Sequence, residues 1–161
     1  KGTYARDKDA IVASMLVCEL AATLKAEGKT ILDALSDLYT NFGFYLSYVQ
    51  SVELSGADAM EKAANMMSDL RQNTPEMIGG EKVTVVRDYQ SRAAKNLENN
   101  TRTEINLPKS NVLELVLGDA GSVIARPSGT EPKVKFYYTA VGKNKDAAKT
   151  LLDKMVAQMS K

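Results

Sequence analysis

Two stretches near the start of the chain carry apolar residues at helical spacing. In the first, residues 8–27, apolar side chains occur on nearly every side, which predicts a helix that is buried over most of its surface. Asp7 or Asp9 can cap its start, and Gly28 can end it. The apolar residues of this stretch are Ile11, Val12, Met15, Leu16, Val17, Cys18, Leu20 and Leu24.

The second stretch, residues 30–42, has its apolar residues on one face. Thr30 caps the predicted helix and Gly43 ends it. The apolar face consists of Ile31, Leu32, Leu35, Leu38 and Phe42. Two helices cannot bury this much apolar surface against each other. We therefore expect residues 1–43 to be the helical end of a domain whose body lies elsewhere, or a segment that needs a partner.

The pattern changes at Phe44. Apolar and more polar residues alternate from there to Leu54, which predicts a strand. Ser55 followed by Asp58 resembles a capping box at the start of a helix. The apolar stripe of that helix consists of Met60, Ala63, Ala64, Met67 and Leu70. A methionine stripe of this kind is typical of core packing, and a binding role is the less common alternative.

Pro75 and the pair Gly79-Gly80 interrupt the chain before a second predicted strand, Lys82 to Tyr89. Residues 90–110 are polar and rich in asparagine, and we expect a long, mobile surface loop there. Three more strands are predicted at 112–117, 122–126 and 134–141, with a hairpin turn at 118–121 and a last helix at 144–159.

The predicted elements define a fold class. From residue 44 their order is strand, helix, strand, loop, three strands and helix. This order predicts an α+β domain over residues 44–161, in which an antiparallel sheet has helices packed on one face. Two helices within residues 1–43 precede it.

Composition adds limits on possible partners. Of the 161 residues, 44% are hydrophobic and 25% are charged, which supports a real core. The net charge is +1, so neither nucleic acid nor an anionic membrane is expected as a partner. No apolar run approaches the roughly 18 residues of a membrane span, and no hydrophobic stretch typical of a secretory signal follows Lys1. Any anion site must therefore be local.

Two residue types limit the chemistry. The sequence has no histidine, which excludes His-ligated zinc and catalysis by Ser-His or Cys-His pairs. The one cysteine, Cys18, cannot form an internal disulfide and lies within an apolar run. We expect it to be a buried thiol in a reducing compartment, with the cytoplasm as the location.

Candidate chemistry is concentrated in one loop between predicted strands, Arg126-Pro127-Ser128-Gly129-Thr130. Arginine can bond two phosphate oxygens at once, and the serine and threonine offer hydroxyl groups. The glycine lets the backbone approach closely or take a positive φ, so that successive N–H groups can converge on an anion. Pro127 and Pro132 stiffen the loop.

A strand with two lysines follows the loop. Alternation along that strand places Lys135 on the same face as Lys133 and Tyr137. The combination suits a phosphate group, although an ordinary turn with a solvated Arg126 is the alternative that the residues alone leave open. Nucleophilic use of Ser128 is disfavoured, because no histidine can activate it and no G-x-S-x-G sequence surrounds it.

The string RPSGTEPKVKFYY, residues 126–138, closely resembles the phosphate-contacting loop of the α-D-phosphohexomutases, the phosphoglucomutase and phosphomannomutase family. Leu107 to Leu113 resembles the stretch before this loop in the phosphoglucomutase branch. Gly2 to Ala10 resembles the segment that follows the sugar-selecting loop in the third domain of these enzymes. The resemblance covers essentially the whole chain.

The resemblance implies that residues 1–43 are the helical end of domain three and residues 44–161 the phosphate-binding domain four. Domain four has a fold like half of the TATA-binding protein, with helices on one side of an antiparallel sheet. By resemblance, the sugar phosphate that is not being transferred is held by Arg126, Ser128, Gly129 and Thr130. Lys135 stands where the family often has an arginine directed at the same phosphate, whereas Lys133 is expected to be solvated.

The same resemblance implies an activity for a longer parent enzyme. The parent would interconvert hexose 1-phosphate and hexose 6-phosphate through a phosphoserine and a bisphosphate intermediate, with Mg²⁺ and an activator of the glucose 1,6-bisphosphate type. The phosphoserine, magnesium and sugar-selecting loops of domains one to three do not match this sequence. The pair of acids in Asp7-Lys8-Asp9 is more typical of a helix cap than of a metal site.

We therefore expect no catalytic and no metal-binding residue in this chain, which would be inactive alone. Its expected partners are a sugar phosphate and domains one to three of the parent. Two other hypotheses stay open: a stand-alone binding module of the same fold, and a mobile lid. In the second, exposed helices at 8–27 and 30–42 would make the chain self-associate.

Overall fold

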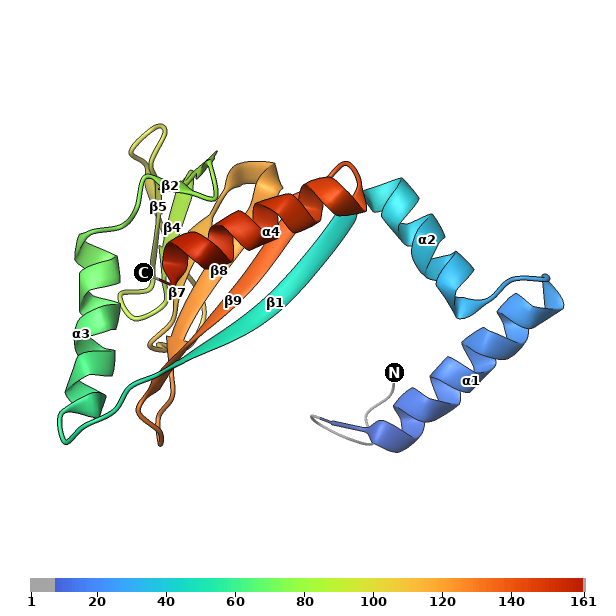
Figure 1. Cartoon of the computed structure of the whole chain (residues 1–161), viewed down its shortest axis with the longest axis horizontal. Coiled ribbons are helices and arrows are strands. Elements are labelled where there is room, and N and C mark those ends of the chain that lie inside the picture. The colour runs from blue at the N-terminus through green and yellow to red at the C-terminus, as the bar shows by residue number, and fades with distance from the viewer. Residues whose placement is uncertain (1–7, 161) are drawn as a thin grey trace. The chain divides into compact units, whose positions relative to one another are not determined.

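The computed structural model describes residues 8–160 (Figure 1). The chain forms two compact units, Lys1–Gly43 and Phe44–Lys161. Most of the segment from Gly2 to Ala10, including Asp7, lies outside the described residues.

The first unit consists of two helices, α1 (Ala10–Ala26) and α2 (Ile31–Phe42). The Asp9 carboxylate caps α1 by accepting a hydrogen bond from the Val12 N–H at 2.9 Å. Thr30 and Asp33 form a reciprocal capping box at the start of α2. Of the two acids proposed to cap α1, Asp9 is the one that does so. Both helices begin and end close to their predicted limits.

The prediction that α1 is buried on most sides is wrong. Leu24 is its only buried residue, and Cys18, expected to be a buried thiol, is exposed. The reason is that α2 is the element of this unit that packs on α1, and one helix cannot cover another that is apolar all round. Exposed apolar side chains of the unit are Ile11, Met15, Leu16, Val17, Leu20, Ile31, Leu32, Leu35, Leu38 and Phe42.

The second unit is built on a seven-stranded sheet with the strand order β1-β9-β8-β7-β4-β5-β6, in which all neighbours are antiparallel. The strands are β1 (Phe44–Glu53), β4 (Val85–Asp88), β5 (Ala93–Asn96), β6 (Arg102–Glu104), β7 (Leu113–Val116), β8 (Gly121–Pro127) and β9 (Lys133–Gly142). A small ribbon is formed by β2 (Met77–Ile78) and β3 (Glu81–Lys82). The helices are α3 (Ala59–Gln72) and α4 (Lys145–Met159).

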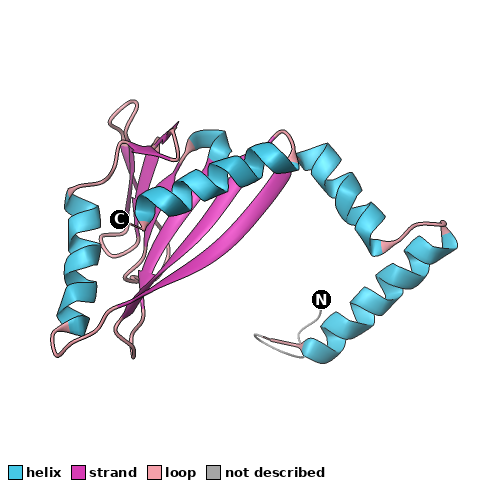
Figure 2. Cartoon of the chain, in the orientation of Figure 1, coloured by secondary structure: helices cyan, strands magenta, loops and turns pink. Residues whose placement is uncertain are grey.

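One face of this sheet carries the core. Side chains alternate along β9, so that Val134, Phe136 and Tyr138 are almost fully buried while the residues between them are not. The helix α4 packs on β1 and β9 and lies across the long strands in Figure 2. The helix α3 packs on β8 and β9. Met67 of α3 and Met155 of α4 complete the cluster. The predicted α+β class, with helices on one face of an antiparallel sheet, is confirmed.

The prediction of one long loop over residues 90–110 is wrong, because β5 and β6 form a hairpin at the edge of the sheet. Asparagines build its turn. The Asn96 side chain accepts hydrogen bonds from the N–H groups of Glu98 and Asn99, and Asn99 accepts one from Thr101. Asn100 adopts a φ of 56°, a conformation that asparagine tolerates better than most residues.

Two smaller predictions are also corrected. The capping box at Ser55 and Asp58 does not form, since Asp58 makes no side-chain cap and instead pairs with Lys62 at 2.9 Å. The predicted strand from Lys82 to Tyr89 is divided between β3 and β4. The division follows from pairing, because β3 pairs with β2 whereas β4 lies between β5 and β7.

Candidate functional site

The loop from Pro127 to Lys133 joins β8 to β9 at one end of the sheet. Arg126 and Lys135 are direct partners across this strand pair. Their neighbours Ala125, Val134 and Phe136 are buried under the helices, so both cations lie on the opposite, open face. Strand alternation therefore predicted correctly which face carries Lys135.

A hollow of about 310 Å³ opens between these two strands and the loop. Its lining consists of Arg126, Pro127, Ser128, Gly129, Thr130, Glu131, Lys133, Lys135 and Tyr137. The structure thus brings together the five residues that the sequence singles out for phosphate. Pairing of β8 with β9 positions the two cations, and the loop closes the hollow at its end.

Hydrogen bonds within the loop engage several of its N–H groups, and two of these converge on one oxygen atom. The Ser128 N–H donates to the Lys133 carbonyl oxygen at 2.9 Å. The Ser128 hydroxyl oxygen accepts from the N–H groups of Thr130 and Glu131, at 3.4 and 3.2 Å. The hydroxyl thus stabilises the turn locally, and it occupies the position from which an oxyanion would accept these two N–H groups.

Of the two roles expected for Gly129, the structure does not show the positive φ. A Cβ atom added there would meet no heavy atom within 4 Å. Folding of the loop therefore does not require glycine at this position. The space around it leaves room for a ligand to approach the backbone closely.

The site also contains an ion pair that the sequence did not indicate. The Lys133 ammonium lies 2.7 Å from the Glu131 carboxylate, and the lysine side chain is only 19% exposed. The hydrogen bond and charge of Lys133, with a smaller effect of Lys135, hold the pKa of the Glu131 carboxyl below its ordinary value. The expectation of a solvated Lys133 is wrong, because the turn brings Glu131 back over the start of β9.

The charge of the lining suits an anion. Three cations, Arg126, Lys133 and Lys135, face one carboxylate, that of Glu131. Three positive charges less one negative charge leave a surplus of two, which matches a phosphate dianion. Within residues 8–160, no group of three or more His, Cys, Asp or Glu side chains is arranged to hold a metal ion. None of the helices in this part of the chain is both long and apolar enough to cross a membrane.

Comparison with known proteins places this chain in a family. Residues 58–158 match the family model described as phosphoglucomutase/phosphomannomutase, C-terminal domain. The chain is 37% identical over 153 residues to a phosphoglucomutase of Staphylococcus aureus, and 39% identical over 134 residues to one of Staphylococcus haemolyticus. These alignments cover 95% and 83% of the chain.

The chain spans only part of these relatives, 28% of the first and 24% of the second. Among solved structures, the open form of parafusin, a phosphoglucomutase from Paramecium, aligns with a TM-score of 0.59 and 15% identity. That alignment covers 98% of this chain and 26% of parafusin. At this identity the likeness supports the fold.

Proposed function

Because the chain belongs to the phosphoglucomutase/phosphomannomutase family, we propose that its loop holds the phosphate of a hexose phosphate in a longer parent enzyme. The residues that hold it are Arg126, Ser128, Gly129, Thr130 and Lys135. The phosphate they bind is the one that is not being transferred. The loop contributes by positioning the substrate, and the reacting groups belong to other domains.

One observation carries this proposal. Arg126 and Lys135 stand directly opposite each other across β8 and β9, and both line one hollow with a surplus of positive charge. Like charges in directly opposite positions destabilise a strand pair unless something offsets them. A phosphate dianion between them would receive the planar fork of the arginine and the ammonium of the lysine.

The Ser128 hydroxyl can change its partners when the anion arrives. In the structure it accepts hydrogen bonds from the N–H groups of Thr130 and Glu131. A phosphate oxygen near that position would accept from the same N–H groups, while the hydroxyl would turn and donate to the phosphate. After the exchange the hydroxyl and both N–H groups would still be hydrogen-bonded.

Charged side chains and backbone N–H donors bind a phosphate group without contacting the sugar to which it is attached. The proposed parent moves a phosphoryl group between the 1- and 6-positions of a hexose, so this loop must accept a phosphate from either end of the substrate. The phosphoserine, the activating bisphosphate and Mg²⁺ would be held by domains one to three.

Kinetics of the full-length enzyme test the proposal. Arg126→Ala removes an interaction made in both ground and transition states, so KM should rise, kcat should fall and kcat/KM should drop about 10- to 100-fold. Arg87→Ala is the control, because Arg87 lies on the same open face but is paired with Glu114 at 3.1 Å. Wild-type kinetics in the Arg126→Ala enzyme would refute the role of the loop.

The isolated chain offers a second test. It should bind glucose 1-phosphate with a Kd of roughly 1 mM or weaker, because the other domains supply most contacts, and it should show no turnover. Backbone amide signals of residues 128–131 should shift on titration in the wild-type chain and stay in place in Arg126→Ala. If the Arg126→Ala chain shifts equally, the loop is not the site, and a stand-alone binding module with another site becomes the better hypothesis.

A further inference from the structure

A second pair of opposed cations lies on the other face of the sheet. Lys95 of β5 and Arg102 of β6 are direct cross-strand partners, and Lys95 in turn stands opposite Val86 of β4. Val86 pairs with the buried Leu115, so this row of residues lies on the face that carries the helices. The arrangement repeats that of Arg126 and Lys135, in which an arginine and a lysine occupy opposite positions of adjacent strands.

Neither cation of the second pair is neutralised. Within residues 8–160, the side chains of Lys95 and Arg102 take part in no hydrogen bond or ion pair. Two carboxylates of the adjoining strands are engaged elsewhere. Asp88 pairs with Arg71 at 3.2 Å, and Glu104 pairs with Arg92 at 2.9 Å. Like charges at directly opposite positions are unfavourable without a counter-ion.

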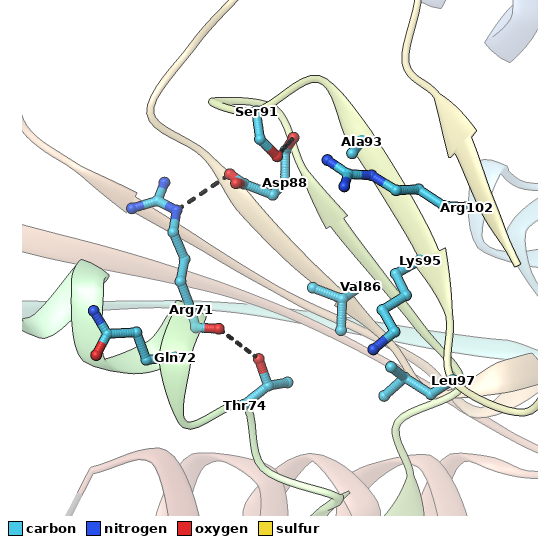
Figure 3. Close-up of a pocket in the computed structure, with 10 residues that line it drawn as sticks. All are labelled: Arg71, Gln72, Thr74, Val86, Asp88, Ser91, Ala93, Lys95, Leu97 and Arg102. Atoms are coloured by element: carbon cyan, nitrogen blue, oxygen red, sulfur yellow. Dashed lines mark hydrogen bonds and ion pairs between the residues drawn. The ribbon is translucent and has the colours of Figure 1, made fainter. Parts of the chain in front are cut away.

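The pair borders a hollow of about 380 Å³ between the end of α3 and strands β4 to β6 (Figure 3). Its lining consists of Arg71, Gln72, Thr74, Val86, Asp88, Ser91, Ala93, Lys95, Leu97 and Arg102. Arg71 and Asp88 neutralise each other, which leaves a surplus of two positive charges from Lys95 and Arg102. The side chains of Val86 and Leu97 add an apolar part to the lining.

We propose that this hollow, which we name the outer cationic pocket, binds a small phosphomonoester such as a sugar phosphate. In Figure 3 the Arg102 guanidinium extends toward Asp88 and the Lys95 ammonium toward Leu97. The phosphate dianion would lie in the hollow between these two head groups, where its charge balances theirs. The carbon skeleton of the ester would pack on Val86 and Leu97. The volume falls within the range of about 300–1,000 Å³ that is common for small-molecule sites.

The outer cationic pocket is independent of the loop at Arg126. The two lie on opposite faces of the sheet and at different strand pairs, β5–β6 and β8–β9. A ligand in one pocket therefore makes no contact with the residues of the other. The proposal stands whether or not the loop holds the substrate phosphate.

An amide-shift titration of the whole 161-residue chain tests it. Inorganic phosphate is added at constant ionic strength, with sodium chloride as the compensating salt. Amides of residues 93–97 and 102–104 should shift with saturation at roughly millimolar phosphate. Lys95→Gln and Arg102→Gln should each weaken this binding about tenfold, because each removes one charge-assisted contact.

Three comparisons identify the site and its ligand. Arg126→Gln should abolish shifts at residues 128–131 and leave those at 93–104 intact, and Lys109→Gln, an exposed lysine outside both pockets, should change neither. Glucose 6-phosphate should bind more tightly than inorganic phosphate if the ester packs on the apolar side chains. Equal affinity would identify the phosphate group itself as the ligand.

Stability gives a second readout in case a variant folds poorly. Phosphate should raise the unfolding midpoint of the wild-type chain more than that of Lys95→Gln. At low salt without phosphate, the Lys95→Gln midpoint should be no lower than wild type, because the substitution removes like-charge repulsion. Shifts that do not saturate, that chloride reproduces, or that persist in the single variants would overturn the proposal.

Discussion

Gly121, where β8 begins, shows how a single backbone position can limit the fold. Its φ is 129°, and an added Cβ atom would overlap the carbonyl group of Thr139 on the adjacent strand. Gly121→Ala should therefore lower the free energy of unfolding by about 3 kcal/mol or more, through strain and strand separation. A denaturant titration measures the loss.

Gly129→Ala is the matched control, because an added Cβ there meets nothing within 4 Å and φ is not positive. Its free energy of unfolding should stay within about 0.5 kcal/mol of wild type. If the loop approaches phosphate closely, the same variant should bind glucose 1-phosphate less tightly. A Gly121→Ala chain as stable as Gly129→Ala would contradict the packing described at β8 and β9.

Tyr138 links stability to alkaline pH. It is 1% exposed, its hydroxyl donates to the Gln50 side chain at 2.8 Å, and burial, with a smaller effect of Tyr48, raises its pKa to about 12. Folding favours the protonated form, so the stabilisation is complete below the unfolded pKa of about 10 and is lost as pH rises toward 12. The expected loss from this group is of order 1 kcal/mol.

The readout is the difference between wild type and Tyr138→Phe, because other tyrosines and lysines also titrate in this range. At pH 8 the Tyr138→Phe chain should be less stable than wild type, because it lacks the hydrogen bond to Gln50. The gap should narrow as pH rises from 10 toward 12. If the free energy of unfolding falls equally with pH in the two chains, Tyr138 does not contribute to the alkaline transition.

Some single residues could be predicted from the sequence and others could not. The residue types from Arg126 to Thr130 point to an anion because the chemistry is local to five consecutive positions. The ion pair of Glu131 with Lys133 depends on how the turn folds back, which composition does not encode. The opposition of Lys95 and Arg102 depends on the register of a hairpin that the sequence pattern did not predict.

At the scale of elements, the ends of α1, α2 and α4 were predicted well because capping is local, whereas the cap predicted for α3 does not form. Thr30 with Asp33 starts α2, Gly43 ends it, and Asn144 caps α4 by accepting from the Ala147 N–H at 2.8 Å. Strand limits were predicted less well, since pairing partners rather than local preference divide β3 from β4. The β5–β6 hairpin was missed because its asparagines are also typical of irregular loops.

Substitution of Asn96 tests how much its side chain stabilises the β5–β6 hairpin. Asn96→Ala removes the acceptor for the N–H groups of Glu98 and Asn99, and should destabilise the hairpin by about 1 kcal/mol. Hydrogen exchange should accelerate in β5 and β6 and stay unchanged in β8 and β9, because the hairpin is at the edge of the sheet. Asn100→Gly is the control, since glycine adopts a φ of 56° without strain. Unchanged exchange in Asn96→Ala would show that sheet pairing alone holds the turn.

At the scale of the whole molecule, the two units differ in how much of their apolar surface each buries by itself. The unit Phe44–Lys161 has a continuous core that joins the sheet to α3 and α4. In the unit Lys1–Gly43, apolar side chains of both helices remain exposed, and Leu24 is the one buried residue among those described. We propose that the rest of domain three of the parent covers these helices.

Exposed apolar faces of this size favour association, so the isolated 161-residue chain should self-associate through α1 and α2. Sedimentation should give an average mass that rises with concentration. Ile11 and Leu32 are 77% and 75% exposed, and a charge at each should oppose burial of the helices against a second copy. The double variant Ile11→Lys with Leu32→Lys should therefore shift the mass toward that of the monomer.

A control with an added charge on the other unit tests whether added positive charge alone, through repulsion between chains, prevents association. The control is Leu107→Lys, because Leu107 is 55% exposed and lies outside both helices. The average mass of this variant should rise with concentration as it does for wild type. The unfolding midpoint of the sheet unit should be the same in all three chains, because neither set of substitutions touches its core. If the wild-type chain stays monomeric at every concentration, exposure of these helices does not drive association. In that case their apolar side chains must be covered within the chain itself.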